Sequence, residues 1–103
     1  EVQLINTGIA INLPNQCAGF VLPRSGLASK YKITLINRPG LIDPGYTGEL
    51  MVPLINHGST DYQISIGDRI AQLVLINTNS VEFKIVDNLP DTERSTGGFG
   101  STD

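Results

Sequence analysis

The fold is decided by the stretch Gly40-Leu41-Ile42-Asp43-Pro44-Gly45-Tyr46-Thr47-Gly48-Glu49, which places a tight turn between two apolar runs. A Pro-Gly pair suits the two central positions of a type II turn, because proline presets its φ angle and glycine tolerates a positive φ. The pattern predicts a β-hairpin with Asp43 and Tyr46 at its tip. Side chains on loops that a rigid scaffold supports are often functional. The alternative is an ordinary turn that Asp43 only completes.

Length and composition restrict the classes of protein that the chain can represent. Its 103 residues predict one domain, which is marginally stable alone and gains from oligomerisation. The net charge is −3 and no run of Lys or Arg occurs, so a nucleic-acid partner is not expected. The single cysteine, Cys17, excludes an intrachain disulfide. With neither a signal peptide nor a long apolar span, we expect a soluble, cytoplasmic protein without a membrane partner.

Short aliphatic and β-branched runs alternate with turn signals along most of the chain, which predicts an all-β barrel or jelly-roll-like sandwich. We expect a bulge at Gly8, and at Pro53 an edge strand or an irregular ladder. Residues 24–28 are expected to form a turn or one helical turn. Residues 1–93 form the predicted barrel domain, and residues 94–103 form a Gly-rich C-terminal arm. The expected strands cover residues 2–13, 18–22, 31–37, 49–56, 62–66, 70–76 and 81–86.

Two further stretches carry groups that suit a phosphate. Arg24 offers a planar cation, Ser25 a hydroxyl and Gly26 a backbone amide, and together they match phosphate oxygens. Gln72 lies in an apolar strand, where its amide is either a structural bridge or a ligand contact. The alternative for Arg24 is a solvated surface turn.

The C-terminal stretch adds a third group of this kind. Arg94 supplies charge, and Gly98 and Gly100 let the backbone approach a ligand closely. Phe99 offers a face on which a flat base can stack. The alternative is a flexible linker with a stray aromatic. Without a zinc, triad or Walker pattern in the chain, these stretches together predict a site for a nucleotide phosphate.

Taken in order, these motifs resemble those of the homotrimeric dUTPase family over essentially the whole chain. They cover residues 23–28, Asn37 with residues 40–49, residues 67–72 and residues 94–101. The resemblance implies a dUTPase-like β-barrel, or distorted jelly roll, with a flexible C-terminal arm. It also implies hydrolysis of dUTP to dUMP and pyrophosphate, which keeps uracil out of DNA and supplies dUMP for thymidylate synthesis. Active sites would be shared between the subunits of a homotrimer.

The resemblance also assigns roles to individual residues. Asp43 would act as the general base that orients the water attacking the α-phosphate. Tyr46 would pack under the deoxyribose and exclude a 2′-hydroxyl, and Asn37 would read the uracil edge. Mg²⁺ would be the cofactor, carried by the triphosphate with no direct protein ligand. The implied substrate-binding residues are Arg24, Ser25, Gly26, Asn37, Gly40, Ile42, Tyr46, Gln72, Arg94, Gly98, Phe99, Gly100 and Ser101.

Two alternatives stay open at this point. A dCTP deaminase, or a bifunctional enzyme, shares the fold and an Ile-Asp-Pro-Gly-aromatic turn. Deaminases resemble one another in a catalytic glutamate where this chain has Pro53, and in Arg-Ser-Ser where it has Arg24-Ser25-Gly26. A weakly active nucleotide-binding or interaction module is the other alternative. It is motivated by the lack of the family's Ala-Gly-x-Asp-Leu first motif, from which we expect the N-terminal strands to be missing.

Overall fold

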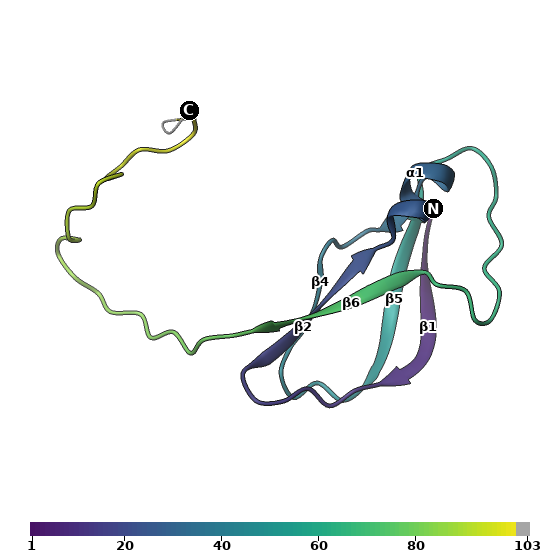
Figure 1. Ribbon diagram of the computed structural model, residues 1–103, viewed down its shortest axis with the longest axis horizontal. Helices are drawn as coiled ribbons and strands as arrows, with labels where there is room; N and C mark the ends of the chain where they lie inside the picture. Colours follow the sequence, from purple (N-terminus) through teal and green to yellow (C-terminus); the bar gives the residue numbers. More distant parts are fainter. Residues whose placement is uncertain (101–103) are drawn as a thin grey trace.

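Two three-stranded antiparallel sheets and one short helix make up the regular structure of the computed structural model, which describes residues 1–100 (Figure 1). The all-β prediction is confirmed. The first sheet has the order β1-β5-β3, with β1 at Val2–Ala10, β5 at Glu49–Asn56 and β3 at Ile33–Leu35. The second has the order β4-β2-β6, with β4 at Gly40–Ile42, β2 at Cys17–Pro23 and β6 at Ala71–Asn77. Helix α1 spans Ser25–Tyr31.

The core lies where β2 of one sheet meets β3 and β5 of the other. Its buried side chains are Val21 from β2, Ile33 and Leu35 from β3, and Val52 and Leu54 from β5. Leu35 has no exposed surface. Burying an aliphatic side chain of this size contributes about 1.5–3 kcal/mol. The strands that flank the Asp43 turn are therefore fixed to a packed centre.

The predicted bulge at Gly8 is confirmed. The pairing of β1 with β5 runs from Val2↔Ile55 to Asn6↔Met51 and then shifts before Ala10↔Glu49. Gly8 has a φ of 74°, a conformation that favours glycine. Its amide, which the bulge removes from the ladder, donates to Oε2 of Glu49 at 2.9 Å.

Of the two alternatives predicted for Pro53, the structure shows the irregular ladder and not the edge position, because β5 is the central strand of its sheet. The pairing of β5 with β3 ends at Leu35↔Leu54. The next residue along β3, Ile36, still donates its amide to the Pro53 carbonyl at 2.9 Å. The ladder is therefore irregular at Pro53, where the carbonyl accepts a hydrogen bond and proline has no amide to donate one.

The predicted hairpin is also wrong, although its turn forms. Gly40–Ile42 pairs with β2 in one sheet, whereas Glu49–Asn56 pairs with β1 and β3 in the other. The Asp43 turn therefore connects two sheets. Since β1 and β3 already occupy both edges of β5, that strand has no free edge with which Gly40–Ile42 could pair.

Three other segments differ from their predicted form. Helix α1 is longer than one turn and takes up the start of the strand predicted at residues 31–37. Residues 62–66 form no strand, yet Tyr62 and Ile64 pack against the core from an irregular segment. The rings of Tyr62 and Tyr31 lie 4.6 Å apart. Residues 81–86 form no strand and are exposed.

Beyond β6 the chain leaves the two sheets and extends away from them (Figure 1). The radius of gyration is 18.9 Å, against about 13 Å for a compact domain of this length. Phe83 is 93% exposed and Ile85 100% exposed. We call residues 78–100 the tail. Within residues 1–100, no helix is long and apolar enough to cross a membrane.

Candidate nucleotide site

A cavity of about 330 Å³ opens beside the Asp43 turn, between the two sheets. Its size falls at the lower end of the range of small-molecule sites. Five of the residues predicted for the site line it: Asn37, Gly40, Ile42, Asp43 and Tyr46. The remaining lining residues are Leu4, Val21, Leu35, Leu41, Glu49, Leu50, Met51 and Pro53. The structure therefore gathers the predicted base-and-sugar half of the site in one cavity.

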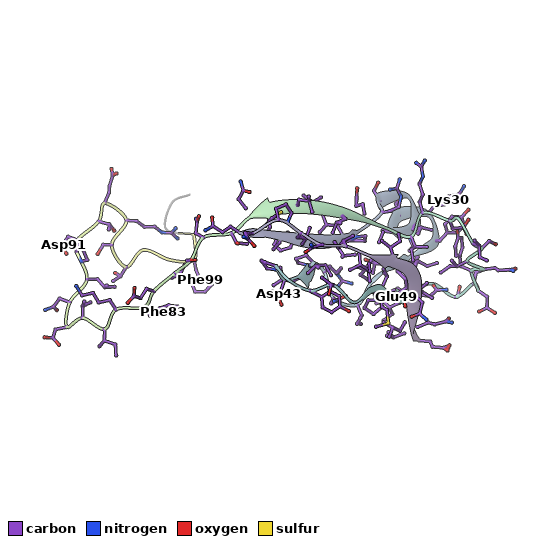
Figure 2. The ribbon with its side chains drawn as sticks, turned by 90° about the horizontal axis from the view of Figure 1, so that it is seen from below. Lys30, Asp43, Glu49, Phe83, Asp91 and Phe99 are labelled. Atoms are coloured by element: carbon purple, nitrogen blue, oxygen red, sulfur yellow. The ribbon has the colours of Figure 1, made fainter. Side chains whose placement is uncertain are left out.

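The turn itself has the predicted geometry. The Tyr46 amide donates to the Asp43 carbonyl at 3.1 Å, and Gly45 has a φ of 89° at the third position. These values identify the type II turn that Pro44-Gly45 predicts. The side chain of Asp43 is exposed on the sheet body (Figure 2). A carboxylate in this position can accept a hydrogen bond from a water beside the cavity.

Two glycines make room for the polar side chains of the cavity. A Cβ on Gly40 would lie 3.2 Å from Nδ2 of Asn37, and a Cβ on Gly48 would lie 2.6 Å from the Tyr46 hydroxyl oxygen. The Tyr46 hydroxyl donates to the Glu49 carbonyl at 2.9 Å. The side-chain amide of Asn37 thus lies close to the backbone of Gly40, and the ring of Tyr46 lies close to the backbone of Gly48.

The predicted phosphate-binding residues lie elsewhere on the chain. In the pairing of β2 with β6, Leu22 faces Gln72, and Arg24 follows directly at the start of α1. The Gln72 amide Nε2 donates to the Pro23 carbonyl at 3.0 Å. Gln72 is therefore a structural bridge in this chain, although one amide hydrogen is left for a ligand. One corner of the second sheet, where β2 ends and α1 begins, holds Arg24, Ser25, Gly26 and Gln72. None of these residues lines the cavity.

The third group lies on the tail. Nε of Arg94 donates to the Gly97 carbonyl at 2.6 Å, and the Gly97 amide donates to the Arg94 carbonyl at 3.0 Å. Phe99 is fully exposed. Figure 2 shows Phe83 and Phe99 on the tail and Asp43 on the sheet body. Gly98 and Gly100 belong to the same tail, and Ser101 lies outside the described residues.

Sequence reasoning missed part of the apolar lining. Leu4 of β1 and Met51 of β5 line the cavity and are both exposed in the single chain. The alternation along β5 predicts that Met51 faces away from the core residues Val52 and Leu54, so the sequence does not show that Met51 lines the cavity. Within residues 1–100, no group of three His, Cys, Asp or Glu side chains could hold a metal ion.

Comparison with known proteins places this geometry in context. A family model described as dUTPase matches residues 1–103. The chain is 51% identical over 102 residues to a deoxyuridine 5'-triphosphate nucleotidohydrolase of Gloeothece citriformis, covering 99% of this chain and 70% of the relative. It is 53% identical over 104 residues to the protein of that name from Tropheryma whipplei, with 97% and 69% covered.

Solved structures give the same result. A mutant dUTPase of phage 80alpha matches with a TM-score of 0.84 at 29% identity, covering 98% of this chain and 75% of the phage protein. A mutant dUTPase of the S. aureus phage phi11 matches with a TM-score of 0.79 at 26% identity, with 88% and 75% covered. That phage structure describes the coordination of a structural Mg(II) ion.

Proposed function

The chain belongs to the dUTPase family, and we propose that it forms its active site around the cavity beside the Asp43 turn. Its reaction is the hydrolysis of dUTP to dUMP and pyrophosphate. The dCTP deaminase alternative is not favoured, because the relatives at about half identity are deoxyuridine triphosphate nucleotidohydrolases. The observation that carries the proposal is the meeting of Asn37, Asp43 and Tyr46 in one cavity.

In this proposal, the cavity binds the uracil and the deoxyribose. The side-chain amide of Asn37 has both a donor and an acceptor, so it can pair with the polar edge of a pyrimidine. Gly40 and Ile42 of β4 form the adjoining wall, where the backbone carries further donors and acceptors. The Tyr46 ring lies on the sugar, where a 2′-hydroxyl would meet an aromatic face and lose its water partners.

Asp43 acts on the water that attacks the α-phosphate. Hydrolysis requires a water aligned with the bond that breaks, between the α-phosphorus and the bridging oxygen to the β-phosphate. The Asp43 carboxylate accepts a hydrogen bond from that water, orients it and takes up its proton. Positioning and stabilisation of charge account for most of the catalysis in phosphoryl chemistry.

The triphosphate is bound by residues of other subunits. Arg24, Ser25, Gly26 and Gln72 form a corner that lies outside the cavity of their own chain. A homotrimer that places this corner of one subunit against the cavity of the next completes the site. Such an assembly is supported by four large apolar side chains that are exposed in the single chain: Val81, Phe83, Ile85 and Leu89.

The arm at residues 94–103 closes over the bound nucleotide from a neighbouring subunit. Phe99 stacks on the uracil, and Arg94 with the amides of Gly98 and Gly100 binds the terminal phosphate. The proposal is supported by the full exposure of Phe99 and by glycines that allow close approach of the backbone. Ser101 belongs to the same group and lies outside the described residues.

Mg²⁺ enters as part of the substrate, bound to the triphosphate. When bound, the metal would offset the repulsion between Asp43 and the phosphates and would supply positive charge near the leaving pyrophosphate. The compartment proposed for this reaction is the cytoplasm, because Cys17 is a free, buried thiol, which suits reducing conditions.

One assay tests the function. The protein is incubated with Mg²⁺ and either dUTP or dCTP, and the products are separated by chromatography. We expect dUMP and pyrophosphate from dUTP, and no uracil nucleotide from dCTP. Deamination of dCTP would contradict the assignment, and nucleotide binding without turnover would support the weakly active alternative.

A further inference from the structure

The geometry around the turn points to Gly48 and Glu49 as positioning residues that hold the Tyr46 ring and thereby set the preference for a deoxyribose. This inference rests on the proposed placement of Tyr46 against the sugar. Tyr46 itself is 43% exposed, so burial alone does not determine where its ring lies. Another restraint is needed if the ring is to distinguish two sugars that differ by one hydroxyl.

The first restraint is packing of the Tyr46 ring on the backbone of Gly48, which is close because Gly48 has no side chain. A Cβ built at this position would lie 2.6 Å from the Tyr46 hydroxyl oxygen, 2.8 Å from Cζ and 3.2 Å from Cε1. The ring therefore packs directly over the backbone of residue 48. Any larger residue at this position forces the ring to move, because the contacts are with a partly exposed side chain that can rotate.

Glu49 supplies the second restraint through its backbone. Its carbonyl accepts a hydrogen bond from the Tyr46 hydroxyl at 2.9 Å, which fixes the outer end of the ring. The ring is thus held at both ends: by the turn at its Cα and by β5 at its hydroxyl.

The side chain of Glu49 fixes the backbone that makes this contact. Its Oε2 accepts the Gly8 amide at 2.9 Å, in the bulge where β1 loses register with β5. The Thr7 hydroxyl donates to the Leu50 carbonyl at 2.7 Å beside it. The β1 bulge therefore anchors residues 49 and 50, and residue 49 anchors the Tyr46 ring.

Gly48→Ala tests the inference directly. The added methyl displaces the ring, so we expect the ratio of kcat/KM for dUTP to that for UTP to fall about tenfold, through KM for dUTP and with kcat within about threefold of wild type. Binding of a non-hydrolysable imido analogue of dUTP, and of its ribose counterpart, should show the same loss of preference by calorimetry. An unchanged ratio in a folded variant would overturn the inference.

Gly58→Ala is the matched control. A Cβ there would also meet close contacts, at 3.2 Å from Oδ1 of Asn56 and 3.3 Å from the Tyr31 carbonyl, but Gly58 lies outside the cavity. We expect Gly58→Ala to leave the preference for dUTP over UTP unchanged. An equal loss of preference in Gly58→Ala would show that general crowding causes the effect, and would overturn the inference.

Three further variants keep the inference testable if Gly48→Ala does not fold. Tyr46→Phe removes only the hydroxyl contact and should lower the preference by about threefold. Glu49→Ala should lower it to a similar extent, and Glu49→Gln should restore it, because glutamine keeps an oxygen for the Gly8 amide. Failure of glutamine to restore the preference would contradict the role of Glu49.

An NMR measurement on the ring itself completes the test. With ¹³C-labelled tyrosine, the ring signal of Tyr46 is assigned by its loss in Tyr46→Phe. It should shift in Gly48→Ala and Glu49→Ala and stay in place in Gly58→Ala. A wild-type protein that does not hydrolyse dUTP would refute the proposed function, whereas an unmoved Tyr46 signal in Gly48→Ala would refute only the positioning role.

Discussion

The Asp43 turn and the tail carry the same kinds of residue but are held in different ways. At the turn, beside a cavity between the two sheets, the Asp43 carbonyl accepts the Tyr46 amide and the Glu49 carbonyl accepts the Tyr46 hydroxyl. In the tail, Phe83 and Phe99 are almost fully exposed, and the hydrogen bonds near Arg94 are local to residues 92–97. The difference fits the proposed function, in which one chain completes the cavity half of the site and an assembly completes the other half.

Asp43→Asn tests the role of the turn, and we expect it to have the largest effect on the reaction. Asparagine keeps the shape of the turn but cannot take up a proton. We expect kcat for dUTP to fall about 10³-fold, while the imido analogue of dUTP binds within a few-fold of wild type. Steady-state kinetics and calorimetry measure the two effects. A variant with wild-type turnover would contradict the role of Asp43.

Removal of residues 94–103 tests the tail. Without the arm, water and mobile phosphates remain at the reacting centre, so we expect kcat/KM to fall about 10²-fold. The melting temperature should stay within a few degrees of wild type, because Phe99, the one aromatic that is removed, is exposed. Unchanged kinetics in the truncated protein would refute the proposed closure.

A pair of variants, Leu35→Ala and Phe99→Ala, tests whether the sheets carry the stability and the tail carries binding. We expect smaller effects on the reaction from this pair. Leu35 is fully buried, so its truncation should lower the free energy of unfolding by about 2–5 kcal/mol. Phe99→Ala should leave stability unchanged and raise KM for dUTP about tenfold through lost stacking. Denaturant unfolding and steady-state kinetics distinguish the two. Loss of stability in Phe99→Ala would show that the tail packs on the sheets.

Several parts of the fold were predictable because local chemistry determines them. Pro44-Gly45 determines the type II turn, and Gly8 determines the bulge through its positive φ. The partners of the strands were not predictable in this way. Nothing local to Gly40–Ile42 indicates that it pairs with β2, and so the predicted hairpin was wrong. The central place of Pro53 likewise depends on where β3 ends.

The candidate site was predictable as a set of residue types, and less so as an arrangement. Asn37, Asp43 and Tyr46 are close in sequence, and the structure brings them together. Arg24 and Gln72 are distant in sequence and meet through the pairing of β2 with β6. In the proposed trimer, their relation to the cavity depends on contacts between chains, which a pattern within one sequence does not encode.

The central claim, that each active site is divided between subunits, is tested most directly by mixing two inactive variants. Asp43→Asn and Arg24→Ala, carrying different tags, are co-expressed and purified through both tags. Each trimer that contains both variants has one site that joins the turn of an Arg24→Ala subunit to the corner of an Asp43→Asn subunit. About a third of wild-type activity per site should therefore return.

The control is the mixture of Asp43→Asn with Asn37→Ala, whose changes both affect the cavity half and should not complement each other. We expect activity of about a third of wild type in the first mixture and background activity in the control. Background activity in both mixtures, from trimers that contain both variants, would contradict a divided site.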